Sequence, residues 1–396
     1  MKKHDNGFIK KQNKKWVLDI VKSKRPISRA EIAKITGMSA TSISRIVQEL
    51  ESEGFLRETE LLSGGVGRKA NLLDIREDAL YTIGVDLSEG MCRIGIMDFT
   101  DNVFYLEKMS MEHGQDPEET LRFIAEAVNR TIREQNLKPD KITGIGIGLP
   151  GIINHRPGVV KRSVQLGWSE IHAAGTLERL TGYPVIVDND LKMFAKAEYR
   201  YGAAQCSKSS VLLGFGSGVG VAIIMNGEFY RGENNLAGEI SHVTVDINGE
   251  QCKCGKIGCL GTIVTEKAMI RQAARFVPVT SVHELIGYYN KQELWALNLL
   301  DRVAAYIAVT ITNCLYLYNP EILVLSGPIL EDYPEIRKLV EEKYKLTVSE
   351  PIPLRMTFKY AQLGDKAIVM GAALQAQDLL FDFDALQISS HKSEDG

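Results

Sequence analysis

The chain has 396 residues, of which 44% are hydrophobic, and a formal net charge of −3 at pH 7, so it is long enough for two or three domains that each bury a core. No run of about 18 uncharged apolar residues occurs, and the N-terminus leads into the lysine-rich stretch Lys10–Lys15 rather than into an apolar signal core. The sequence therefore predicts a cytoplasmic protein that is neither exported nor membrane-spanning.

The charge is distributed unevenly along the chain. Residues 1–70 hold about 15 Lys and Arg against about 8 Asp and Glu, so the rest of the chain is acidic. A basic segment on an acidic body is typical of a polyanion-binding module attached to another domain. A solvated N-terminal face without any partner would give the same charge balance.

Residues 1–77 have the pattern of a winged helix-turn-helix domain. Apolar residues at helical spacing begin at Gln12 and stop before Pro26, which predicts a first helix. Ser28 and Glu31 have the spacing of a capping box, and they start a short second helix that stops at Gly37.

A third helix is expected from residue 39 to residue 54, with small hydroxyl side chains on the face opposite its apolar side, as in a recognition helix. Residues 63–70 are predicted to form the glycine-rich tip of a β-wing, whose basic side chains enter a minor groove or clamp phosphates. A protein-interaction domain built from the same three helices is the alternative. The predicted DNA contacts are Ser39, Thr41, Ser42, Ser44, Arg45, Arg68 and Lys69.

From Leu80 onward, apolar strands broken by glycines alternate with helical patterns, which indicates an α/β fold. Two lobes are expected, over residues 78–200 and 201–396, and the second lobe also holds the C-terminal helices. The expected strands cover residues 81–87, 93–97, 142–149, 185–188, 210–224 and 322–327.

Three of the six cysteines lie within eight positions, and a histidine precedes them by ten residues. One imidazole and three thiolates suit a tetrahedral Zn²⁺ ion, and Gly255 and Gly258 permit the tight turn that such a site needs. A filled ligand shell makes the metal structural rather than hydrolytic. Reduced cysteines in a loop are the alternative. The predicted ligands are His242, Cys252, Cys254 and Cys259.

Six segments of the body carry motifs: the Asp86 strand and residues 148–151, 188–190, 216–220, 238–242 and 252–259. Together these motifs resemble those of the ROK family, which groups repressors, open reading frames of unknown role and sugar kinases. The resemblance covers nearly the whole chain, and in that family only the regulators carry an N-terminal winged helix. It implies two actin-like, hexokinase-like lobes that bind a sugar between them.

The resemblance also implies a sugar site. Family members usually have glutamate at the position of Gly261 and asparagine at the position of Gln165, so the expected ligand differs from plain glucose. Either a bulkier or differently substituted sugar uses the space at Gly261, or the pocket has lost sugar binding. A helix N-cap is the alternative role for Asn189 and Asp190. The sugar contacts implied are Gln165, Asn189, Asp190, Glu239 and His242.

The phosphate loops depart from those of the family's kinases. Ser88 and Glu89 replace a glycine pair, and Glu89 puts a negative charge where phosphate oxygens would lie. The second loop keeps its glycines at residues 216–220, although a tight strand turn would also explain them. No enzymatic activity is therefore expected.

We expect a sugar-responsive repressor of carbohydrate-metabolism genes that binds double-stranded operator DNA as a homodimer or higher oligomer. An ATP-dependent sugar kinase with Asp190 as general base is one alternative. A regulator whose effector is another protein is the other.

Overall fold

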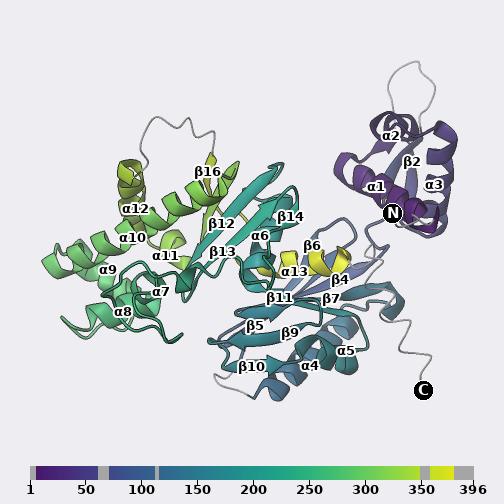
Figure 1. Ribbon diagram of the computed structural model, residues 1–396. Helices are drawn as coiled ribbons and strands as arrows, with labels where there is room; N and C mark the ends of the chain where they lie inside the picture. The colour runs from purple at the N-terminus through teal and green to yellow at the C-terminus, as the bar shows by residue number, and fades with distance from the viewer. Residues whose placement is uncertain (1–5, 61–70, 112–115, 348–356, 379–396) are drawn as a thin grey trace. The chain divides into compact units, whose positions relative to one another are not determined.

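The computed structural model describes residues 6–60, 71–111, 116–347 and 357–378 (Figure 1). The chain divides into two compact units, and it passes from one to the other after Asp188 and back again after Ile368. The first unit therefore holds both ends of the chain, whereas the second is one continuous segment.

The N-terminal head of the first unit is a winged helix-turn-helix, as predicted. The Ser28–Glu31 capping box starts the second helix, and Gly37, with φ of 70°, ends it in the left-handed conformation. The small sheet has the order β1-β3-β2. The elements are α1 (Asn6–Lys24), β1 (Ile27–Ser28), α2 (Arg29–Thr36), α3 (Ala40–Ser52), β2 (Leu56–Glu60) and β3 (Asn71–Ile75).

A five-stranded sheet of order β11-β7-β4-β5-β6 forms the body of the first unit. Alternate residues of β4, such as Ile83 and Val85, share a core with the helix α4 (Pro117–Glu134). The remaining elements are β4 (Tyr81–Ser88), β5 (Met91–Asp98), β6 (Val103–Ser110), β7 (Ile142–Leu149), β8 (Ile152–Asn154), β9 (Val159–Ser163), β10 (Trp168–Ile171), α5 (Ala173–Thr181) and β11 (Val185–Asn189).

The other face of this sheet is covered by α13 (Ala367–Asp378), which lies unusually close to the strands. A Cβ atom at Gly84 would overlap the carbonyl oxygen of Val369, and one at Gly146 would overlap that of Ala372. Only glycine permits this approach of helix to sheet. The units therefore have different limits from the expected lobes, because α13 returns to the first unit and α6 (Asp190–Tyr201) lies in the second.

The β5–β6 turn joins the head to the body of the first unit. Phe99 of this turn is fully buried in the core of the head, where its ring centroid lies 5.3 Å from that of Phe55. Lys22 at the end of α1 pairs with Asp101 at 2.9 Å and donates to Gln377 of α13 at 2.9 Å. Head, sheet and α13 thus meet around one buried lysine.

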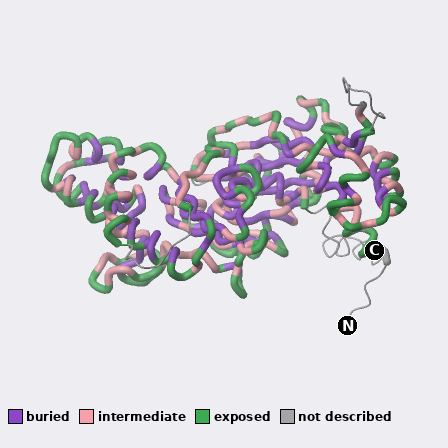
Figure 2. The backbone as a smooth tube through the Cα atoms, turned by 90° about the horizontal axis from the view of Figure 1, so that it is seen from above, coloured by how far each residue is buried: buried purple, intermediate pink, exposed green. Residues whose placement is uncertain are grey.

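The second unit contains another five-stranded sheet, of order β14-β13-β12-β15-β16. The single strand expected over residues 210–224 is instead a hairpin, because the chain turns at Gly216–Gly218 and pairs with itself. The central strands of both sheets consist mostly of buried residues, which are purple in Figure 2. The strands are β12 (Ser209–Phe215), β13 (Val219–Met225), β14 (Glu228–Phe229), β15 (Ile322–Ser326) and β16 (Thr357–Tyr360).

The longest helix of the second unit, α10 (Leu294–Tyr318), is by length and composition apolar enough to cross a membrane. It contains Asp301 and Arg302, and one of its faces is buried in the core that the sheet and the other helices form. It is therefore a core helix. The other helices are α7 (Gly261–Val264), α8 (Glu266–Ala273), α9 (Val282–Asn290), α11 (Pro328–Glu331) and α12 (Pro334–Thr347).

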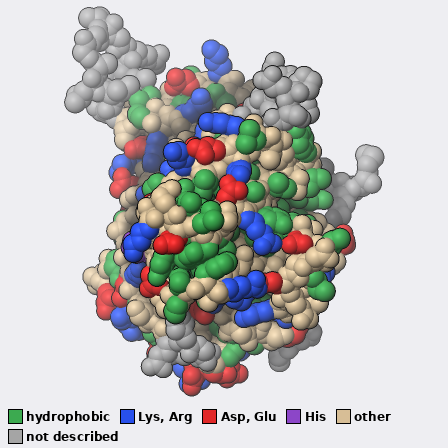
Figure 3. Space-filling view, turned by 90° about the vertical axis from the view of Figure 1, so that its left-hand side faces the viewer, with side chains coloured by type: hydrophobic (Ala, Val, Ile, Leu, Met, Phe, Trp, Pro, Cys, Tyr) green, Lys and Arg blue, Asp and Glu red, His purple; other side chains and the backbone are tan. Residues whose placement is uncertain are grey.

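The surface carries mixed charge on the face drawn in Figure 3. Among the described residues there, Lys and Arg side chains are interspersed with Asp, Glu and hydrophobic ones. This face thus presents no single-sign field of the kind that attracts a polyanion over a long range.

Candidate functional site

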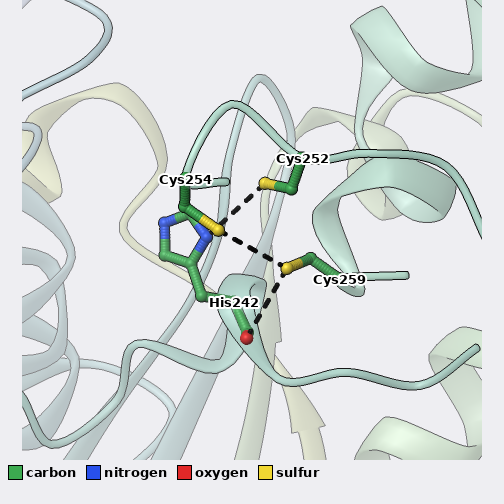
Figure 4. A group of neighbouring side chains, drawn as sticks. All are labelled: His242, Cys252, Cys254 and Cys259. Carbon is green, nitrogen blue, oxygen red and sulfur yellow. Dashed lines mark hydrogen bonds between the residues drawn. The ribbon is translucent and has the colours of Figure 1, made fainter. Parts of the chain in front are cut away.

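A cluster of one histidine and three cysteines lies in the second unit (Figure 4). The ligand atoms of His242, Cys252, Cys254 and Cys259 all lie within 4.8 Å of one another. The Cys254 and Cys259 sulfurs are 3.7 Å apart, and His242 Nδ1 is 3.7 Å from the Cys252 sulfur. Zn–S bonds of about 2.3 Å in a tetrahedron separate two sulfurs by about 3.8 Å. The donor set and its spacing therefore fit one tetrahedral metal ion.

Glycines shape the loop that carries the cysteines, as the sequence predicted. Gly255 and Gly258 have φ of 93° and 70°, and a Cβ at Gly258 would overlap the carbonyl oxygen of Asp246. The Cys252 amide donates to the carbonyl of Lys256 at 2.7 Å, which closes the turn. The turn brings the cysteines to the same point.

The thiols of the cluster have different environments. A hydrogen bond from the backbone amide of Lys256 lowers the pKa of Cys254, whereas burial raises the pKa of Cys259 to about 12. A metal cation would stabilise the thiolate form of both, so metal binding would release protons.

The first turn of α6 carries Asn189 and Asp190. Asn189 is the N-cap of this helix, and its Oδ1 accepts from the Lys192 amide at 3.2 Å. Asp190 is the first helical residue, and its Oδ1 accepts from the Leu191 amide at 2.8 Å. The capping role is therefore confirmed for Asn189, while a sugar contact at either residue stays a prediction.

Lys192 links this turn to the segment that precedes Glu239. Its side chain is 6% exposed, and its Nζ donates to Asn235 Oδ1 at 2.7 Å and to the Asn235 carbonyl at 3.2 Å. Arg231 donates to the same Oδ1 at 3.0 Å. The sequence alone did not indicate Lys192 and Asn235, because no local pattern pairs residues that lie 43 positions apart in the chain.

Glu239 precedes the short helix η2 (Ile240–His242), and His242 is its last residue. Burial raises the pKa of Glu239, while the charges of His242 and Lys192 lower it, so these three side chains are electrostatic neighbours. His242 Nδ1 faces the cysteines. The other ring nitrogen, Nε2, is therefore the atom with which His242 would contact a sugar. Gln165 lies in the first unit, on the turn between β9 and β10, and is half-buried.

The space expected at Gly261 is already occupied. A Cβ atom built on Gly261 would collide with the Ser241 hydroxyl oxygen, so Ser241 fills the volume that a side chain at residue 261 would take. The use of this space by a bulkier or differently substituted sugar stays a prediction, and it would require the Ser241 side chain to move.

The two loops compared with kinase phosphate loops are both hairpin turns. Ser88 pairs with Met91 across the first turn, and Arg93 donates to the buried Asp86 carboxylate at 2.7 Å. In the second turn, the Gly216 amide donates to the Gly218 carbonyl at 2.9 Å, which agrees with the tight-turn explanation of its glycines.

The predicted DNA-contacting side chains of α3 divide into two groups. Ser39 caps the helix: its Oγ accepts from the Ser42 amide at 3.2 Å and donates to the Ser42 hydroxyl at 2.9 Å. Thr41 and Arg45 are exposed, and Ser44 is half-buried. Arg68 and Lys69 lie outside the described residues.

The acidic residues of α3 are paired with basic residues of the other helices. Hydrogen bonds from Lys10 and Lys14 lower the pKa of Glu49 to about 2, and Arg29 pairs with Glu51 at 3.1 Å. These pairs offset the negative charge of the two acidic residues of the helix.

Comparisons with known proteins agree with this geometry. A model of the ROK family matches residues 82–379, and a model of winged helix-turn-helix DNA-binding domains matches residues 12–57. The xylose repressor of Bacillus subtilis (strain 168) is 25% identical over 378 residues, which cover 96% of this chain and 98% of the repressor. The DNA-binding transcriptional dual regulator NagC of Escherichia coli (strain K12) is 26% identical over 341 residues, which cover 82% of each chain.

A crystal structure of a ROK family transcriptional regulator, a homolog of the E. coli MLC protein, has a TM-score of 0.82 at 24% identity and covers 96% of this chain and 98% of its own. The predicted order of a winged helix-turn-helix followed by a mixed α/β body is confirmed. Since the family model covers well over half of its length, the chain belongs to the ROK family.

Proposed function

We propose that the protein is a sugar-responsive repressor of carbohydrate-metabolism genes that binds double-stranded operator DNA in the cytoplasm as a homodimer or higher oligomer. One observation carries this proposal: a DNA-binding head and a ROK body occur in one chain, which matches the xylose repressor over almost the full length of both. NagC, over most of its length, supports the same reading.

DNA recognition is assigned to the exposed face of α3. The Arg45 guanidinium suits bidentate bonds to a guanine edge, and the Thr41 hydroxyl suits a base or a phosphate. Ser39, Ser42 and Ser44 have short side chains, which let the backbone approach the groove. A dimer would read two half-sites about one helical turn, or a multiple of it, apart.

The effector is assigned to Gln165, Asn189, Asp190, Glu239 and His242. Carboxylates accept hydrogen bonds from sugar hydroxyls, and a Zn²⁺ ion on His242 Nδ1 would fix the tautomer in which Nε2–H donates to a further hydroxyl. The metal is then structural, and it orients one sugar ligand. Effectors of this kind change operator affinity by roughly 5–150-fold.

The kinase alternative has less support. Asp86 is paired with Arg93, and Glu89 adds a negative charge at the turn where a kinase needs bare backbone amides. Retained glycines in the second turn are explained by the hairpin itself.

The test compares Asp190→Asn with the wild-type protein. Asparagine keeps the Oδ1 atom that accepts from the Leu191 amide but removes the charged acceptor for a sugar. A thermal-shift panel of sugars and sugar phosphates first identifies the effector, since ligand at about 100 times Kd adds roughly 2.7 kcal/mol. Operator titrations with and without it then measure the response.

We expect Asp190→Asn to bind operator as wild type does without sugar and to lose the sugar response. The exposed Asp140→Asn variant is the matched control. A normal sugar response in Asp190→Asn would show that the effector binds elsewhere.

A further inference from the structure

Lys192 is a buried lysine that none of the predicted contacts includes. We propose that it is a positioning residue of the effector site: its ammonium holds the segment 231–239, which leads into Glu239, against the first turn of α6, which carries Asp190. This inference rests on the proposed function, because it assumes that a sugar binds between these two segments.

The side chain of Lys192 is held in one position by buried hydrogen bonds and is not solvated. Its Nζ donates to two acceptors on a single residue, the side-chain and main-chain oxygens of Asn235, at 2.7 and 3.2 Å. Hydrogen bonds from an ionised donor are short and strong, and a buried ammonium is costly without them. The bonds therefore define both the position and the orientation of Asn235.

Asn235 extends the constraint imposed by Lys192 to the rest of the segment 231–239. It is 8% exposed and has φ of 58°, a left-handed conformation that asparagine adopts more easily than most residues. Arg231 donates to its Oδ1 at 3.0 Å, while the Arg231 carbonyl accepts from the Ala237 amide at 3.1 Å. The segment is thus bonded to itself around the atom that Lys192 holds.

The far end of the segment is fixed independently. Gly238 accepts from the Val221 amide at 3.1 Å, and a Cβ on Gly238 would overlap the Val221 carbonyl oxygen, so this residue lies directly on β13. Glu239 follows immediately. Its backbone is therefore anchored to β13 by Gly238, and its distance from the α6 turn is set by Lys192 and Asn235.

A sugar that bonds Asp190 and Glu239 together requires the two carboxylates at a fixed separation. An error of about 1 Å in such a site costs binding, because hydrogen bonds weaken steeply with distance and angle. Lys192 is a side-chain link between the two segments, so it helps to set this separation without touching the sugar.

The experiment uses the full-length protein with bound zinc and three changes: Lys192→Met, Lys192→Arg and Asn235→Ala. Lys208→Met, at an exposed lysine of the same unit, is the control. The probes are D-xylose, D-glucose, N-acetyl-D-glucosamine and their phosphates, and calorimetry gives Kd for each one that raises the wild-type melting temperature. Thermal unfolding without sugar and operator binding verify that each variant folds.

We expect Lys192→Met to raise Kd about 10-fold or more, because charge-assisted bonds that fix a binding segment are lost. Lys192→Arg should recover most of the affinity, since a guanidinium still donates to both oxygens, whereas a purely apolar packing role would be met better by methionine. Asn235→Ala should weaken binding in the same direction. If Lys192→Met does not fold, Asn235→Ala decides the question.

Three results distinguish a failure of the proposed role of Lys192 from a failure of the proposed sugar site. Wild-type Kd in Lys192→Met or, where that variant does not fold, in Asn235→Ala, with lost binding in Asp190→Asn, overturns the role of Lys192 and leaves the effector site intact. Lost binding in Lys192→Met without recovery in Lys192→Arg also overturns it. Wild-type Kd in Asp190→Asn, or no binding of any probe to the wild-type protein, overturns the proposed sugar site instead.

Discussion

The two units are built on the same sheet plan but carry different attachments. In each sheet, a first strand pairs antiparallel with the next strand in the chain and parallel with a later one, β4 with β5 and β7 in the first unit and β12 with β13 and β15 in the second. The first sheet holds the DNA-binding head on its β5–β6 turn, whereas the second holds the cysteine cluster in the loops after β14. The repeated sheet is therefore a scaffold, and each task lies in what is attached to it.

If the functions are separated in this way, a substitution in one unit should impair the function of that unit. The metal, DNA or sugar binding that belongs to the other unit should stay unchanged. The expected effects differ widely in size.

The largest effect is expected from loss of a cluster ligand in the second unit. Cys254→Ser should abolish a stoichiometry of about one zinc per chain and lower the melting temperature, because metal binding to such a site contributes on the order of 10 kcal/mol to folding. Metal analysis of protein purified without added metal measures the zinc. The exposed Cys206→Ser is the control, and a wild-type protein without zinc would contradict the assignment.

The next largest effect is expected at the joint of the first unit. Asp101→Asn tolerates the φ of 67° at this position but leaves the buried Lys22 ammonium without its carboxylate. Urea unfolding should show a loss of about 3–5 kcal/mol, while zinc content stays unchanged. Glu170→Gln, in an exposed pair with Lys161, should cost less than about 1 kcal/mol. Equal losses in the two variants would show that the joint is not a buried ion pair.

A smaller effect is expected for Arg45→Ala on α3. The loss of a base contact should weaken binding to an operator selected from random DNA by about 1–3 kcal/mol and relax the preference at one position. Sugar affinity should not change. Titrations with operator and scrambled DNA separate a base contact from a phosphate contact: an equal loss on both would place Arg45 on the backbone and lower the salt dependence by about one charge.

The smallest effect is expected from restoring glycines in the β4–β5 turn, which corresponds to the first phosphate loop of the kinases. The double change Ser88→Gly and Glu89→Gly should produce no sugar kinase activity, because Arg93 still pairs with Asp86. A coupled assay with ATP and hexoses measures turnover. A rate of about 1 per second or faster in the wild-type protein, within the usual range of kinases, would overturn the non-enzymatic reading.

Local signals predicted the head well. The capping box at Ser28 and the glycine at residue 37 involve neighbouring residues, so the sequence alone contains them. The hairpin at residues 209–225 was missed as such, because two apolar strands separated by a short glycine turn look like one continuous run. The place of α13 depends on Gly84 and Gly146, which lie more than two hundred residues away, and the Lys192–Asn235 pair is equally invisible to a local pattern.

The cluster residues were predicted together because their spacing is short and their chemistry is specific. The sugar contacts depended on resemblance, and the structure adds what resemblance could not supply: the capping role of Asn189 and the Ser241 hydroxyl in the space beside Gly261. The cap is a local hydrogen bond that the sequence already offered as an alternative. The contact of Ser241 with Gly261 is packing between two segments, which a local sequence pattern does not encode.

The position of α13 also affects how the protein is made. A ribosome releases the second unit, residues 189–368, as one uninterrupted stretch, whereas one face of the first sheet has no cover until α13 emerges. During that interval Lys22 lacks its Gln377 partner, and the strands beside Gly84 remain open to other chains. The nascent protein therefore depends on a late-synthesised helix to complete its earliest-synthesised half.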